Sequence, residues 1–243
     1  AMGDDGFTPG TENYLQPDDF PSFKIYDYSE GEYFDAYPSE NYPFEANAIF
    51  NIDELMLDIS YSIPLHQYNN LVSFYVLPED NSVSNVMLDI QDYINFVIGE
   101  SESAQLNGGY WTGYLTNLDI SSGYWLNMID SDTLDGSGHS LNPGRVYNLH
   151  SGANLVSFPS PPGSVGISAG LPDEIEDNVI AIIGESFSTI NTENGWLGSL
   201  LEFESLHGYW IITNDAISFS YELDSLETLS RSINLYKTAK KPL

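Results

Sequence analysis

The sequence predicts a mainly β protein with a minor α+β character. Two tandem repeats of about 84–85 residues, related by a pseudo-twofold axis, follow an N-terminal β-hairpin arm. First, short apolar runs recur about every ten residues and are separated by Gly, Asn and Ser, as in antiparallel sheets. Second, three phrases occur twice in one register, which marks a duplicated structural module. These phrases are Asn70–Phe74 with Asn154–Phe158, Ile98–Ser101 with Ile183–Ser186, and Gly123–Leu126 with Gly208–Ile211.

The first element is the segment 1–57, which lies outside the repeat. Its aromatic-rich runs Phe23–Tyr28 and Tyr33–Tyr37 flank a connection that contains Gly31, and this pattern is typical of a β-hairpin. The apolar pattern of Ala46–Leu57 predicts one further strand. Because two or three strands are few for an independent domain, we interpret this segment as an arm on the first repeat or the end of a preceding module.

The two repeats span residues 58–138 and 143–222, and residues 223–243 form a C-terminal tail. Each repeat is expected to open with a pair of antiparallel strands, to continue with one short helix and to close with three strands. The opening pairs are 62–65 with 71–76 in the first repeat and 146–149 with 155–158 in the second. The helices are 82–93 and 172–178. The closing strands are 95–98, 110–115 and 123–128, with counterparts at 179–183, 196–201 and 208–213.

The chain contains the phrases NLVSF, IIGES, GWLGSL and SGYWL and, before the repeats, PSFKIYDYSEGEYFDA. Together they resemble tandem β-rich repeat modules of large secreted or cell-surface proteins of marine bacteria, which are often associated with type IX secretion. The opening MGDDG…PDDFPSFKIYD is similar to the end of the module that precedes the repeats in those proteins. The resemblance covers most of residues 3–222. It implies a β-rich fold, a secreted or cell-surface location and neighbouring modules in a longer chain, but no role for a single residue.

The charge of the chain restricts its partners. Its 36 acidic residues outnumber 6 basic residues and give a net charge of −30. Such a chain repels nucleic acid and anionic membranes, so neither is an expected partner. The charge suits a salty extracellular setting, where salt screens the self-repulsion, better than it suits cytoplasm. The chain has no cysteine and no apolar run of about 18 residues, which excludes disulfides, thiolate zinc sites and membrane insertion by a helix.

Aromatic residues are the first candidates for ligand binding. The four tryptophans occur two per repeat and in register, and a ring at the surface suits the apolar face of a sugar. A ring that is kept in both repeats can equally fill the two cores. Strand alternation turns one residue of each Tyr-Trp pair inward and the other outward. The candidates for sugar binding are Trp111, Trp125, Trp196, Trp210, Tyr124, Tyr209 and His207, the last being unique to the second repeat.

The glutamates of the repeated Gly-Glu-Ser phrase are the candidate catalytic residues. Glu100 and Glu185 each follow an apolar strand, where desolvation can raise a carboxyl pKa and prepare a general acid. If the repeats pack around a pseudo-twofold axis, the two carboxylates could face each other as the pair that glycoside hydrolysis requires. The alternative is a turn in which each carboxylate accepts backbone N–H bonds.

The acidic run 130–138 is the candidate metal site. Asp130, Asp132 and Asp135 supply oxygen ligands that could bind Ca²⁺, although the spacing departs from an EF-hand loop because its fifth position is Leu134. The alternative is a solvated linker between the repeats. His66 and His150 occupy matching positions and are interpreted as structural, since no His-x-x-x-His zinc spacing exists. No other cofactor is expected.

These patterns leave three functions open. The first is an extracellular module for surface adhesion or polysaccharide binding through exposed aromatics, with a carbohydrate or cell-surface polymer as its partner. A repeated weak site of this kind would gain avidity. The second is a glycoside hydrolase that uses an Asp/Glu pair near the repeat interface. The third is a structural spacer, which would bury all four tryptophans.

Overall fold

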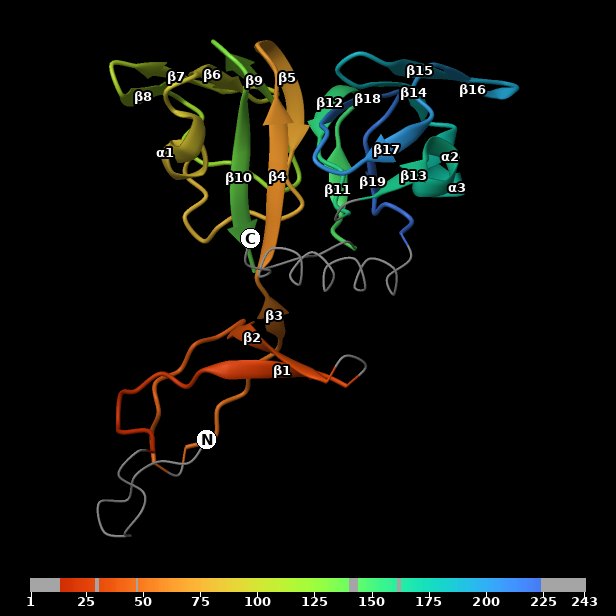
Figure 1. The fold of residues 1–243 in the computed structure, drawn as a ribbon. Coiled ribbons are helices and arrows are strands. Elements are labelled where there is room, and N and C mark those ends of the chain that lie inside the picture. The colour runs from red at the N-terminus through yellow and green to blue at the C-terminus, as the bar shows by residue number, and fades with distance from the viewer. Residues whose placement is uncertain (1–13, 29–30, 47, 140–143, 161–162, 224–243) are drawn as a thin grey trace. The chain divides into compact units, whose positions relative to one another are not determined.

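The computed structural model describes residues 14–28, 31–46, 48–139, 144–160 and 163–223 (Figure 1). This part of the chain is mainly β, with several antiparallel sheets and only short helices, as the sequence predicts. The chain divides between Asp58 and Ile59 into two compact units, which we call unit 1 and unit 2. No helix within the described ranges is long and apolar enough to cross a membrane.

Unit 1 contains the predicted hairpin, extended by a third strand. β1 (Phe23–Asp27), β2 (Glu32–Pro38) and β3 (Leu55–Leu57) form an antiparallel sheet in the order β1-β2-β3. Gly31, between β1 and β2, has a φ of +71°, which glycine adopts without steric cost. Strand alternation places Phe34 on the buried face of this sheet.

In repeat 1 (58–138), five antiparallel strands form a sheet in the order β5-β9-β6-β7-β8. Their bounds are β5 Tyr68–Ser73, β6 Ile94–Ile98, β7 Ser103–Asn107, β8 Tyr110–Gly113 and β9 Gly123–Met128. A second, two-stranded sheet pairs β4 (Ile59–Leu65) with β10 (Asp132–Gly138). Residues of both sheets belong to one core.

Repeat 2 (143–222) has the matching sheet order β12-β18-β14-β15-β16, and Figure 1 shows the two five-stranded sheets side by side. The bounds are β12 Gly152–Val156, β14 Val179–Ile183, β15 Ser188–Thr192, β16 Gly195–Gly198 and β18 Tyr209–Thr213. As β4 pairs with β10, β11 (Tyr147–Leu149) pairs with β19 (Ile217–Phe219). One further pair joins β13 (Ser164–Gly166) to β17 (Glu202–Glu204).

The opening strands of both repeats exist, but the predicted pairing between them is wrong. β4 pairs with β10 and β5 with β9; likewise β11 pairs with β19 and β12 with β18. The chain turns a corner between β4 and β5, and again between β11 and β12. The side chain of Asn70 accepts the N–H of His66 at 2.9 Å and donates to its carbonyl oxygen at 2.8 Å. Asn154 makes the same two bonds to His150, each at 2.8 Å, so an asparagine side chain replaces a hairpin ladder.

The helices differ from the expectation of one per repeat. In repeat 1, α1 (Val83–Val86) ends after one turn and is followed by a 3-10 turn, η1 (Leu88–Ile90). Repeat 2 has two one-turn helices, α2 (Ile167–Gly170) and α3 (Asp173–Glu176). Pro172 separates them, because a proline disfavours the helical conformation in the residue before it.

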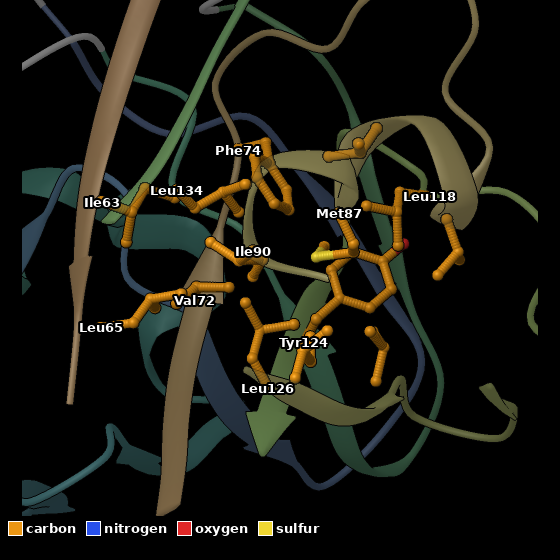
Figure 2. Close-up of a cluster of buried hydrophobic side chains, with 14 of the residues drawn as sticks. Ile63, Leu65, Val72, Phe74, Met87, Ile90, Leu118, Tyr124, Leu126 and Leu134 are labelled. Atoms are coloured by element: carbon orange, nitrogen blue, oxygen red, sulfur yellow. The ribbon is translucent and has the colours of Figure 1, made fainter. Parts of the chain in front are cut away.

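Each repeat has its own hydrophobic core, and matching positions fill both. Figure 2 shows side chains of β4 and β10 directed at the same core as those of β5 and β9; the labelled residues of these strands are Ile63, Leu65, Leu134, Val72, Tyr124 and Leu126. In repeat 2 the positions that match Val72, Tyr124 and Leu126 are occupied by Val156, Tyr209 and Ile211, which are also buried. The repeated phrases therefore supply the interior of both cores.

Candidate functional site

The two repeats meet at Gly123, the first residue of β9, and at Gly208, the residue before β18. A Cβ atom on Gly208 would lie 2.8 Å from the carbonyl oxygen of Val72 and 3.2 Å from the Cα atom of Gly123. A Cβ atom on Gly123 would lie 3.0 Å from the carbonyl oxygen of Val156. Such a close approach of two backbones requires glycine. The repeated Gly-Tyr-Trp phrase thus serves the junction as well as the cores.

Buried serines link the two backbones in a reciprocal way. The N–H of Ser73 donates to the carbonyl oxygen of Leu206 at 2.9 Å, and the N–H of Ser157 donates to that of Ser121 at 3.0 Å. Both serine hydroxyls also donate across the junction, at 2.7 Å each. Because both serines are fully buried, these bonds satisfy polar groups that water cannot reach.

The two candidate glutamates reinforce the same junction. One oxygen of Glu185 accepts the N–H of Leu71 at 2.7 Å, and the other lies 2.6 Å from Nε2 of His66. Glu100 repeats this arrangement toward the second repeat, with 2.7 Å to the N–H of Leu155 and 2.8 Å to Nε2 of His150. We call each of these arrangements a Glu–His clasp.

The clasp geometry fits protonated histidines. Nδ1 of His66 lies 2.7 Å from the carbonyl oxygen of Gln67, so both ring nitrogens face hydrogen-bond acceptors and both can donate when the ring is protonated. The carboxylate of Glu185 is the main cause that raises the pKa of His66, followed by the carbonyl of Gln67. For His150 the pKa is also raised, first by the carbonyl of Ser151 and then by Glu100.

The structure therefore shows where the predicted catalytic pair lies. Each carboxylate is held by a histidine and a backbone N–H of the other repeat. Glu185 lines a cleft together with His207 and Tyr209, whereas Glu100 is not among the lining residues. A catalytic role for Glu100 and Glu185 stays a prediction.

The predicted aromatic ligands divide between core and surface. Tyr124 and Tyr209 are core residues that are 2% exposed, and their hydroxyl oxygens accept the N–H groups of Asp119 and Glu204 at 2.6 Å and 2.7 Å. Their buried rings are therefore not available for stacking on a ligand at the surface. Their partners in the Tyr-Trp pairs point to the opposite sheet face, as strand alternation predicts.

All four tryptophans are partly buried, and each keeps some exposed surface. Trp111 and Trp196 pack against the cores, and the indole N–H of Trp196 donates to the carboxylate of Glu176. Trp125 and Trp210 lie on the sheet faces that point away from the cores. The spacer interpretation requires four buried tryptophans, so the observed exposure does not support it.

The acidic run before repeat 2 forms a strand and not a solvated linker. Asp132 and Asp135 belong to β10, and the fully buried Leu134 between them anchors that strand. Strand alternation turns Asp132 and Asp135 to opposite faces, while Asp130 lies just before the strand. Across the described ranges no group of three or more His, Asp or Glu side chains is arranged to hold a metal ion. Calcium binding here stays a prediction.

Unit 1 presents tyrosines on the open face of its sheet. Tyr26 and Tyr33 are cross-strand neighbours with ring centroids 4.7 Å apart, and the ring of Tyr28 lies 6.5 Å from that of Tyr26. These side chains are 48%, 68% and 90% exposed for Tyr26, Tyr33 and Tyr28. The next cross-strand pair on this face, Lys24 and Asp35, is an ion pair. We call these five residues the tyrosine face.

Sequence reasoning missed the tyrosine face and the clasps for different reasons. The tyrosines were visible as strand residues, and their alternation with Phe34 could have placed them on the outer face. The clasps left no such signal, because 119 residues separate His66 from Glu185. No family model, curated protein or solved structure matches this chain, so the geometry of its own residues carries the functional argument.

Proposed function

We propose that this protein is an extracellular polysaccharide-binding module whose tyrosine face stacks on the apolar faces of sugar rings. The supporting observation is a group of three tyrosine rings, in which Tyr26 contacts both Tyr28 and Tyr33, that remain exposed on one side of a sheet. A tyrosine offers a rigid apolar ring and a hydroxyl group, and both suit a sugar. A contiguous exposed aromatic patch marks a contact surface more often than a scattered ring does.

The charged pair on the same face completes the interaction. The ammonium of Lys24 can donate hydrogen bonds and the carboxylate of Asp35 can accept them, beside the rings of Tyr26 and Tyr33. Sugar hydroxyls provide both donors and acceptors. The arrangement therefore allows stacking and directed hydrogen bonds on one face of the sheet.

The net charge of the chain restricts the polymers that can bind and favours one location for the protein. A chain with a net charge of −30 repels anionic polysaccharides, so we expect neutral or cationic polymers to bind. The same charge, and the resemblance to secreted repeat modules, support an extracellular or cell-surface location. Trp125 and Trp210 are partly exposed at matching positions and offer two further, weaker contacts.

Binding to a panel of neutral polysaccharides, measured by affinity electrophoresis and titration calorimetry, tests this function. Tyr26→Ala combined with Tyr33→Ala is expected to weaken binding at least about tenfold, since loss of a central aromatic contact costs about 1–2 kcal/mol or more. Both side chains point away from the buried face, so circular dichroism of the variant should match that of the wild type.

The matched control removes two exposed tyrosines elsewhere. Tyr110 and Tyr114 of repeat 1 are 78% and 87% exposed, and Tyr110→Ala with Tyr114→Ala should leave the affinity unchanged. The proposal fails if the wild type binds no polymer in the panel, or if the Tyr26/Tyr33 variant binds as the wild type does.

A glycoside hydrolase is the second candidate, and one observation favours it. Glu185, Glu202 and Glu204 line the same cleft. Glu202 and Glu204 lie two residues apart on one face of β17, so their Cα atoms are about 6.6 Å apart along the strand and their carboxyl groups can reach the separation of an inverting pair. Inverting hydrolases separate their carboxyl groups by about 6.5–9.5 Å. Release of reducing ends from the same panel, compared between the wild type and Glu202→Gln, decides this; a panel without any hydrolysis removes the candidate.

A further inference from the structure

A cleft of about 410 Å³ lies at the junction of the two repeats. Repeat 1 supplies one wall from the end of β4, from His66 and from residues 70–72 of β5. Repeat 2 supplies the other from the β14–β15 connection, including Phe187, and from residues 200–209. Sites for small molecules typically measure about 300–1,000 Å³, so this cleft has room for one.

The cleft is lined by side chains that distinguish repeat 2 from repeat 1. At a spacing of 85 residues, Phe187, Glu202, Glu204, Leu206 and His207 correspond to Glu102, Asn117, Asp119, Ser121 and Ser122. The identical residues described above serve the cores and the junction. Residues that differ are free to serve a site, and five of them meet in this cleft.

The counterparts in repeat 1 are engaged in local contacts. The side chain of Asn117 donates to that of Asn81 at 2.8 Å, and the carboxylate of Asp119 accepts the N–H of Ser121 at 2.7 Å. In repeat 2, Phe203 is fully buried between Glu202 and Glu204, so alternation turns both carboxylates away from the core. The two glutamates lie on one exposed side of β17.

The charges of the cleft are not balanced by its own residues. Glu185 is paired with His66 in a clasp. The described lining residues include no lysine or arginine, and the carboxylate of Glu204 approaches only Nδ1 of His207, at 3.9 Å. Beside these charges stand two apolar side chains, Phe187, which is 58% exposed, and Leu206. A ligand that combines a positive charge with an apolar body would match both features.

We propose that this cleft binds a small ligand that carries a protonated primary amine. The ammonium group lies between Glu202 and Glu204, and the body of the ligand packs against Phe187 and Leu206. Charge-assisted hydrogen bonds of this type are about twice as strong as neutral ones. Amino sugars and lysine side chains both offer this chemistry. All residues of this site belong to unit 2, so the proposal does not rest on polysaccharide binding by the tyrosine face of unit 1.

The test uses the full chain and two pairs of probes in titration calorimetry at low salt. A glucosamine disaccharide is compared with its N-acetylated counterpart, and a lysine-containing tripeptide with its norleucine counterpart. Binding of at least one amine probe is expected, with at least tenfold weaker binding of its neutral counterpart. Glu202→Gln with Glu204→Gln should weaken the amine probe at least tenfold. The probe that binds identifies the source of the amine.

A matched variant separates a built site from general attraction to an acidic chain. Glu174→Gln with Glu193→Gln removes two exposed charges from repeat 2 outside the cleft and should leave the affinity unchanged. Phe187→Ser should weaken binding without changing the charge. Equal losses in the two double-glutamine variants would overturn the proposal, as would a wild type that binds neither amine probe.

Discussion

Single residues at the junction make contacts that other side chains cannot make. Gly208 lets its backbone approach the carbonyl oxygen of Val72, and His66 uses both ring nitrogens between Gln67 and Glu185. The sequence showed these positions in register with Gly123 and His150, which indicated a shared structural role. It did not show the contact partners, because register relates equivalent residues and not touching ones.

Gly208→Ala is expected to lower the free energy of unfolding by about 1–3 kcal/mol, the usual cost of overpacking a tight contact. The added methyl group would lie 2.8 Å from the carbonyl oxygen of Val72, so the repeats must move apart. Urea denaturation followed by tryptophan fluorescence measures the change.

Gly166→Ala is the matched control for this prediction. Gly166 has a φ of −56°, and an added Cβ atom meets no neighbour within 4 Å. Alanine should be neutral there or stabilising by about 0.4–1 kcal/mol, because it restricts the unfolded chain. Equal destabilisation at both positions would contradict the close approach of the repeats at Gly208.

At the scale of elements, the corners between strands were harder to predict from the sequence than the strands themselves. The periodicity of two correctly predicted that one residue of each Tyr-Trp pair, in β9 and in β18, points to the core and the other away from it. It could not predict that Asn70 and Asn154 close the corners and send consecutive strands into different sheets. A polar side chain that bonds its own backbone four residues away leaves no periodic pattern in the sequence.

Asn70→Ala is expected to cost about 1–3 kcal/mol of stability, because the N–H and carbonyl of His66 lose their partner in a part-buried corner. Thermal unfolding by circular dichroism measures this loss. Asn107→Ala serves as the control: Asn107 is exposed and donates only to the hydroxyl of Thr112 at 3.2 Å, so a change within about 0.5 kcal/mol is expected. A neutral Asn70→Ala would show that the corner does not depend on this side chain.

At the scale of the whole molecule, two separate cores are joined by reciprocal contacts about Gly123 and Gly208. Both Glu–His clasps belong to this joint, and each binds a carboxylate of one repeat to the histidine and backbone of the other. The stability of the joint is therefore coupled to the protonation of His66 and His150.

The unfolding temperature is expected to fall as the pH rises above the unfolded-state histidine pKa of about 6.5. The folded-state pKa values of His66 and His150 are raised. Their contribution is thus complete below the unfolded-state pKa and is lost as the pH rises through the folded-state pKa. Scanning calorimetry at a series of pH values measures this dependence.

The variant His66→Gln with His150→Gln decides whether the clasps cause the effect, since the chain has two further histidines. The variant should unfold with a clearly smaller pH dependence and at a lower temperature below pH 6.5. A variant with the slope of the wild type would assign the dependence to other groups.

Patterns along the chain were enough to predict the mainly β class, the N-terminal hairpin, the opposite faces of the two residues in each Tyr-Trp pair and the equivalence of residues such as Tyr124 and Tyr209. Alternation and register depend on local spacing, which the chain carries along its length. The folded chain was needed to show how the opening strands of each repeat pair, that Glu100 and Glu185 hold the histidines of the opposite repeat, and that Glu202 and Glu204 line a cleft. The clasps join residues 50 and 119 positions apart, and the two walls of the cleft come from different repeats. Such proximity arises only when the chain folds.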